Sequence, residues 1–366
     1  MIFKGIRKKI CAMIVAGAVG FSFAMPIQIA EAISPGRLIS IGVAAGTTAY
    51  QMNQVKKACK QLNYTDEGRR ELYNSFRKNY GVNSNSTVNA QLERIMKNLS
   101  SAVAQVDPTI NDRPYLYFVS NDESINAACG MGHVMMVNIG TFNNITNEDE
   151  IAAIVGHEMG HGQKDHVYKS IQKKQTKALA VGIGTAAVGG GILTQLAAQV
   201  ALINSNAHSD KKHETEADAL SLDYMVRTGY NPGACAAVMQ RFVDVFGKSK
   251  KSSIFNPSDH PDSEVRRDRA AKYLYNYSGK IANAANGIVT IKGKNFCAPV
   301  ASATMSGAER SYFVLGNLAR AFHDGQGTSS ATVQNGSVYL GSQLIFTPES
   351  GDESAEVLAE RLNSLK

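Results

Sequence analysis

The segment His157-Glu158-Met159-Gly160-His161 constrains this chain more than any other feature of its sequence. It lies in an apolar stretch with helical spacing, and on a helix two histidines four residues apart project from one face, one turn apart. Both imidazoles can then reach one metal ion, while Glu158 can take a proton from water without being a ligand. The alternative is a surface helix with two unrelated histidines, but unpartnered polar groups on an apolar helix are costly.

A catalytic zinc site needs a third protein ligand and an open position for water. The HExxHxxGxxH pattern fails, because Lys164 and Val167 stand where its glycine and third histidine belong. The remaining candidate for the third ligand is a carboxylate from a later helix. The HETEAD segment that begins at His213 supplies Glu214 for this role. Asp218 shares a helical face with Glu214 and can accept an N–H from a ligand histidine. The alternative for this segment is an exposed acidic helix start.

HEMGH, the later ETEAD and the run Gly229-Tyr230-Asn231-Pro232 together resemble a gluzincin family. This metallopeptidase family includes HtpX, the CAAX prenyl proteases, mitochondrial Oma and the exported periplasmic proteases BepA and LoiP, and the chain is most similar in type to the last two. The resemblance covers about residues 120–273. It implies an α+β, mainly helical zincin-like domain with a small β-sheet. It also implies one Zn²⁺ per chain, with His157, His161 and Glu214 as ligands, Glu158 as catalytic base and Asp218 as partner of a ligand histidine.

Two further expectations come from the resemblance. An edge strand before the HExxH helix is expected to bind an extended substrate by β-augmentation, and the residues at its place are Gly132, His133, Val134 and Met135. The alternative for these residues is an ordinary core strand. A later His-Pro segment makes His260 a candidate for closing the metal site in a latent state, with Arg266 or His260 as candidates for stabilising the oxyanion. The alternative for His260 is a helix-start histidine.

The N-terminus predicts export. Basic residues at positions 4 and 7–9 precede an apolar run at 10–24, and a small-x-small site ends at Ala32. This pattern predicts that residues 1–32 are a signal peptide. The alternative is an uncleaved anchor helix. The whole chain carries a net charge of +7, and removal of the leader leaves 34 basic and 30 acidic residues, a net charge of +4. No nucleic-acid partner is expected at that charge without a basic cluster interleaved with aromatic residues.

The exported chain would keep Cys59, Cys129, Cys235 and Cys297, an even set in a compartment where disulfides persist. Three pairings are possible, and the sequence does not choose among them. His166, His208 and His213 lie off the faces of the motif helices and are expected to be solvated.

We expect a metallopeptidase domain at 33–278 and a small α+β accessory domain at 279–366. Residues 178–203 carry no charge and predict a buried or membrane-surface helical hairpin, with a membrane-spanning helix as the alternative. Thr146 and Asp149 predict a capping box for the HExxH helix. Periodicity predicts helices at 65–80, 87–106, 147–166, 210–228, 232–246, 307–322 and 353–365. It also predicts strands at 115–119, 133–139 and 287–292, and a hairpin at 331–346 about Asn335-Gly336.

The function predicted from these features is that of an exported zinc metalloendopeptidase in cell-envelope protein quality control. Its substrates would be proteins or peptides such as misfolded envelope proteins. It would lie in the periplasm or at the envelope, attached to a membrane or to an assembly partner. The alternative is an envelope assembly factor or chaperone that uses the zinc fold as a scaffold. The intact Glu158 favours the enzyme, because a structural zinc site does not need it.

Overall fold

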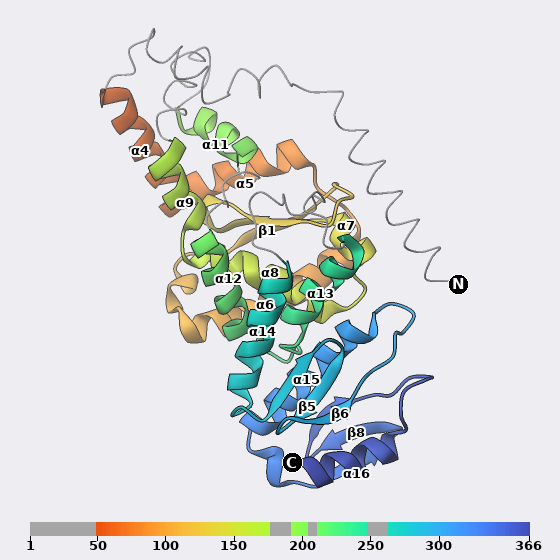
Figure 1. Ribbon diagram of the computed structural model, residues 1–366. Coiled ribbons are helices and arrows are strands. Elements are labelled where there is room, and N and C mark those ends of the chain that lie inside the picture. The colour runs from red at the N-terminus through yellow and green to blue at the C-terminus, as the bar shows by residue number, and fades with distance from the viewer. Residues whose placement is uncertain (1–48, 176–191, 204–210, 247–262) are drawn as a thin grey trace. The chain divides into compact units, whose positions relative to one another are not determined.

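The computed structural model describes residues 49–175, 192–203, 211–246 and 263–366 (Figure 1). The predicted signal peptide, His208, His260 and most of the apolar stretch 178–203 lie outside the described residues. Among the described helices, none has the length and apolar character needed to cross a membrane. The chain forms two compact units, Met1–Glu93 with Asp107–Asn144 and His161–Asp210, and Arg94–Val106 with Ile145–Gly160 and Lys211–Lys366.

The first unit contains a three-stranded sheet in the order β1-β3-β2. Strand β3 (Val134–Asn138) pairs in parallel with β1 (Leu116–Ser120) and antiparallel with β2 (Ala127–Cys129). Helix α5 (Asp66–Tyr80) packs against β1, and α4 (Ala49–Tyr64) and α11 (Ile192–Ile203) pack on α5 (Figure 1). The unit also contains η1 (Pro108–Asn111), η2 (Met131–His133), α7 (Ile139–Asn144), α9 (His166–Ser170) and the π-helical turn η3 (Ile171–Gln175).

Helix α5 begins where its sequence predicts. The Thr65 side chain caps it by accepting a hydrogen bond from the Gly68 amide at 3.1 Å. Two acidic residues in its first turn and two basic residues in its last turn complement the helix dipole. Leu72 and Phe76 then face the core of the unit, where both are fully buried.

The prediction of an edge strand at Gly132, His133, Val134 and Met135 is wrong. Gly132 and His133 lie in the turn η2 with φ angles of 69° and 56°, and Val134 and Met135 begin the central strand β3. Strands bond to β3 on both sides, so its backbone cannot accept a substrate strand. Within the described sheet the edges are β1 and β2. The sequence of β3 gave no sign that the short strand β2 would cover its second side.

The second unit contains the helices of the HExxH segment and the C-terminal part of the chain. Its helices are α6 (Ser86–Val106, partly in the first unit), α8 (Glu148–Gln163, whose last turn is counted in the first unit), α12 (Lys211–Met225), α13 (Ala234–Phe246), α14 (Ser263–Tyr277), α15 (Gly307–His323), η5 (Gln326–Thr328) and α16 (Ala355–Leu365). Two antiparallel sheets follow α14. The first comprises β4 (Ala282–Ala285), β5 (Ile288–Ile291) and β6 (Lys294–Cys297), and the second β7 (Ala331–Gln334), β8 (Ser337–Leu340) and β9 (Gln343–Phe346).

The C-terminal residues share one hydrophobic core with helices α12, α13 and α14. Leu222 and Leu274 belong to the same buried cluster as Val289, Leu315 and Leu358. Arg320 on α15 also donates hydrogen bonds to backbone carbonyls that follow α12, at 3.1 Å to Thr228 and 2.7 Å to Tyr230. The domain boundary after residue 278 stays a prediction, and it would cut through this core.

Several predicted elements differ in detail from the structure. The hairpin about Asn335-Gly336 is confirmed, although its second strand divides into β8 and β9 at Gly341. The predicted capping box at Thr146 is wrong, because the Asn147 side chain accepts the Asp149 amide at 2.8 Å. The four cysteines among the described residues are free thiols.

Candidate metal centre

Small residues bring the HExxH helix close to the helix that carries the predicted third ligand. A Cβ atom at Gly160 of α8 would lie 3.0 Å from the Cα and the carbonyl oxygen of Ala217 in α12. One turn earlier, a Cβ at Gly156 would lie 3.1 Å from Ser221 Oγ, which donates a hydrogen bond to the Ala153 carbonyl at 3.0 Å. The two helices therefore approach at a distance that larger side chains would prevent.

This approach gathers the three predicted ligands. The Nε2 atom of His157 lies 3.4 Å from Oε2 of Glu214. His161 follows on the last turn of the same continuous helix, and the ligand atoms of His157, His161 and Glu214 lie within 4.8 Å of one another. All three side chains are buried, with Glu214 fully so. Two imidazoles and a carboxylate suit a transition metal, and a cation would offset the cost of burying that carboxylate. The donor set therefore fits a metal ion.

Asp218 lies on the opposite edge of the first imidazole. Its Oδ1 atom is 2.9 Å from His157 Nδ1, and Arg266 Nε donates to Asp218 Oδ2 at 2.9 Å. Burial raises the pKa of Asp218, but Arg266 and His157 outweigh it and hold that pKa well below its usual range. The ionised carboxylate therefore accepts a hydrogen bond from the Nδ1–H group of His157, and Nε2 of the same ring faces Glu214.

His157 itself has a raised pKa without metal. Burial and the Arg266 charge lower the pKa, but hydrogen bonds to Asp218 and Glu214 outweigh them and raise it to about 9. A metal ion must therefore displace a proton from this histidine at neutral pH.

Arg266 was predicted as a group near the substrate oxyanion. The structure places its guanidinium against Asp218, with both Nε and Nη2 donating to that carboxylate. Burial lowers the pKa of Arg266, but the neighbouring carboxylates of Asp218, Glu214 and Glu158 hold it above its usual value. Arg266 Nη2 also lies 3.2 Å from His157 Nδ1, so the guanidinium contacts both Asp218 and the candidate ligand, and Glu158 lies buried within reach of the same charge.

The prediction that His166 is solvated is wrong. His166 is 1% exposed, and its Nδ1 atom lies 3.0 Å from Nδ1 of the ligand candidate His161. A helix continuing to residue 166 would point this side chain away from His161. Helix α8 instead ends at Gln163, and Asp165 adopts a left-handed conformation with φ 51° and ψ 37°, which redirects the chain. His213 is partly buried. Sequence periodicity missed His166 because it does not show where a helix stops.

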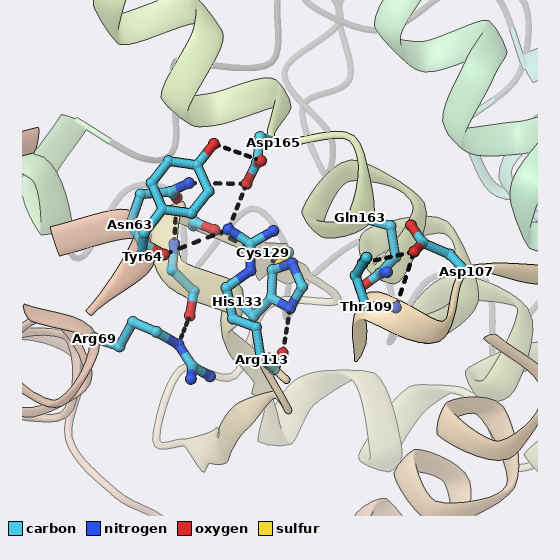
Figure 2. A network of polar contacts seen from close by, with 12 residues as sticks. Asn63, Tyr64, Arg69, Asp107, Thr109, Arg113, Cys129, His133, Gln163 and Asp165 are labelled. Atoms are coloured by element: carbon cyan, nitrogen blue, oxygen red, sulfur yellow. Dashed lines mark hydrogen bonds and ion pairs between the residues drawn. The ribbon is translucent and has the colours of Figure 1, made fainter. Parts of the chain in front are cut away.

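The turn that precedes β3 has a structural role. Figure 2 shows the polar network around it, in which Asn63 Oδ1 accepts the Gly132 amide at 2.7 Å and Arg69 Nε donates to the Gly132 carbonyl at 2.7 Å. His133 Nδ1 lies 2.7 Å from the Arg113 carbonyl, and its ring stacks on Tyr115 at 4.5 Å. Burial lowers the pKa of His133 to about 4, so this imidazole is neutral at physiological pH.

A cavity of about 140 Å³ lies between α8, α12, α13 and α14. Its wall includes His157, Asp218 and Arg266 together with apolar side chains such as Ile154 and Met239, but not His161, Glu158 or Glu214. The cavity therefore borders only His157 of the three candidate ligands, on the side of Asp218 and Arg266.

The sequence profile of peptidase family M48 matches residues 86–274, which is more than half of the chain. The chain belongs to peptidase family M48. The matched segment contains both HExxH histidines, Glu158, Glu214, Asp218 and Arg266. This membership and relatives named as metalloproteases identify the chain as a metalloendopeptidase. The predicted resemblance is thereby confirmed.

Similar M48 proteins differ in how much of their length the chain covers. The metalloprotease LoiP of Escherichia coli is 29% identical over 197 residues, which are 51% of this chain and 75% of LoiP. A putative beta-barrel assembly-enhancing protease of Vibrio cholerae is 24% identical over 254 residues, 65% of this chain and 48% of that protein. The mitochondrial metalloendopeptidase OMA1 of Arabidopsis thaliana is 26% identical over 148 residues, 40% of this chain and 29% of OMA1. The chain therefore spans less than half of the last two relatives.

Proposed function

We propose that this chain is an exported zinc metalloendopeptidase that degrades misfolded proteins of the cell envelope. The observation that carries the proposal is the buried group of His157, His161 and Glu214, with Glu158 next to the first ligand on the same helix. Two imidazoles and one carboxylate form a ligand set of catalytic zinc sites that leave a position open for water. Export is supported by the leader-like residues 1–32, and the envelope role by the name of the Vibrio cholerae relative, a putative beta-barrel assembly-enhancing protease.

In the proposed reaction, a zinc ion held by His157, His161 and Glu214 would supply Lewis acidity to the attacking water and the scissile carbonyl. Glu158 accepts the proton of that water and later donates it to the leaving amine. Asp218 fixes the ring of His157 through its 2.9 Å contact with Nδ1. Arg266 keeps Asp218 ionised, because its buried guanidinium contacts both carboxylate oxygens.

The substrate would bind as an extended strand on the edge strand β2. Within the described sheet, β2 bonds to β3 and lies at one edge, which is where an extended peptide can add to a sheet. Its last residue, Cys129, packs close to the end of α8, since a Cβ at Gly162 would lie 2.9 Å from Cys129 Sγ. Gly162 directly follows His161, so a peptide on β2 would run beside the last turn of the metal helix.

The test is the Glu158→Gln variant with the exposed Glu216→Gln as its matched control. Zinc content and hydrolysis of an unfolded protein are measured on the same preparations. Glu158→Gln is expected to keep one zinc per chain and to lose about 100-fold or more in rate, because general acid–base catalysis contributes roughly 10²–10⁴-fold. Retained zinc with undiminished hydrolysis would defeat the proposal. Full protection of envelope proteins by Glu158→Gln in cells would support the scaffold function instead.

A further inference from the structure

The two histidines of the metal helix have different partners at Nδ1. His157 faces the carboxylate of Asp218 at 2.9 Å, whereas His161 faces the imidazole of His166 at 3.0 Å. Both rings of the second pair are buried, each 1% exposed, and they meet edge to face with centroids 5.0 Å apart. The two Nδ1 atoms therefore lie at hydrogen-bond distance in a buried environment, where polar groups are normally paired.

We propose that His166 is a positioning residue that orients the metal ligand His161. The inference rests on the proposed zinc site. A hydrogen bond between two imidazole nitrogens needs one donor and one acceptor. Because His166 occupies Nδ1 of His161, the atom left for the metal is Nε2, which carries no proton when it binds. Nδ1 of His161 is then the donor, and His166 accepts as a neutral imidazole with its own proton on Nε2.

The position of His166 is set by the residue before it. The Asp165 carboxylate accepts hydrogen bonds from Asn63 Nδ2 at 2.9 Å, Arg113 at 2.9 Å and the Tyr64 hydroxyl at 3.0 Å, as Figure 2 shows. Its amide donates to the Gly162 carbonyl at 2.9 Å, which closes a tight turn after α8. This turn reverses the chain so that His166, the first residue of α9, returns to His161.

The contact between His161 and His166 differs from the contact between His157 and the Asp218 carboxylate. A carboxylate holds a full charge against the ligand ring, whereas a neutral imidazole supplies only an acceptor lone pair. The contribution of His166 is therefore directional: it selects the tautomer and orientation of His161. Partners of this kind typically change metal affinity by about 10–100-fold when they are removed.

Two variants separate orientation from packing. His166→Phe keeps an aromatic ring but removes the acceptor, and His166→Asn keeps an acceptor oxygen near the place of Nδ1. The matched control is His323→Asn, because His323 in α15 also contacts an aromatic ring, that of Tyr277 in α14. Zinc affinity of the full chain is measured by competition with a chromophoric chelator, and the melting temperature of each metal-free protein is measured in parallel.

His166→Phe is expected to bind zinc about 10–100-fold more weakly, with a metal-free melting temperature close to that of the parent. His166→Asn should recover part of the loss. Parental zinc affinity in His166→Phe would overturn the inference, and so would equal losses in both variants with lowered melting temperatures. His161→Ala tests the underlying site separately: undiminished zinc binding there would reject the ligand set itself, whatever His166 does.

Discussion

Replacement of Asp218 by Asn should damage folding and zinc binding through two separable effects. The Arg266 side chain is 5% exposed and donates to both oxygens of Asp218. An amide at position 218 removes the charge of the one carboxylate that this buried guanidinium contacts in the described hydrogen bonds. Breaking a buried pair on one side costs about 3–5 kcal/mol, and we expect the lower figure because the Asp218 side chain is 18% exposed.

Zinc binding should weaken for a different reason. Asp218 holds the Nδ1 proton of His157, and loss of such a partner lowers metal affinity by about 10–100-fold. The double variant Asp218→Asn with Arg266→Met removes the buried charge as well as its partner. Compared with Asp218→Asn alone, it should regain about 2 kcal/mol or more of unfolding free energy. Its zinc affinity should nevertheless stay about 10–100-fold below that of the parent protein.

Urea denaturation in the presence of a chelator measures the stability of all three proteins, and competition titration measures their zinc affinity. The reasoning is refuted if the double variant regains parental zinc affinity, since Asp218 would then act only by neutralising Arg266. It is also refuted if Asp218→Asn alone unfolds at the parental urea concentration.

Three further predictions test the helix packing, the protonation of the site and the shared core. Gly160→Ala should lower unfolding free energy by about 1–3 kcal/mol in thermal denaturation, because its Cβ would lie 3.0 Å from Ala217, whereas Gly229→Ala, with nothing within 4 Å, should have little effect. Apparent zinc affinity should rise about tenfold from pH 7 to pH 8 and level off above the His157 pKa of about 9, because the protonated ring cannot bind a metal ion. A zinc affinity that does not change between pH 7 and pH 8 would contradict that pKa. A chain ending at residue 281 should lose cooperative unfolding by circular dichroism, since it lacks Val289 and Leu315 of the shared core; a soluble, zinc-loaded product would show instead that 279–366 is a separate domain.

The elements that sequence periodicity predicts well are helices with a strong local signal. Helix α5 begins within one residue of its predicted start, and α12 and α13 lie within their predicted ranges. Each of these signals depends on residues a few positions apart, which the helix itself brings together. The edge strand failed for the opposite reason, because the partners of β3 come from separate segments of the chain.

The sequence by itself determined the ligand candidates. The spacing of His157 and His161 is a property of any helix, and Glu214 and Asp218 follow the same rule on α12. The meeting of the two helices was decided only by tertiary packing at Gly160 and Ala217.

The partners of the ligands were also decided by the tertiary structure. Arg266 reaches Asp218 from α14, and His166 reaches His161 because the chain turns at Asp165 in a left-handed conformation. Helical spacing is a local property that a sequence displays directly. The end of a helix and the neighbour of a buried charge depend on contacts between distant segments, such as Asn63 with Asp165, and only the folded chain contains them.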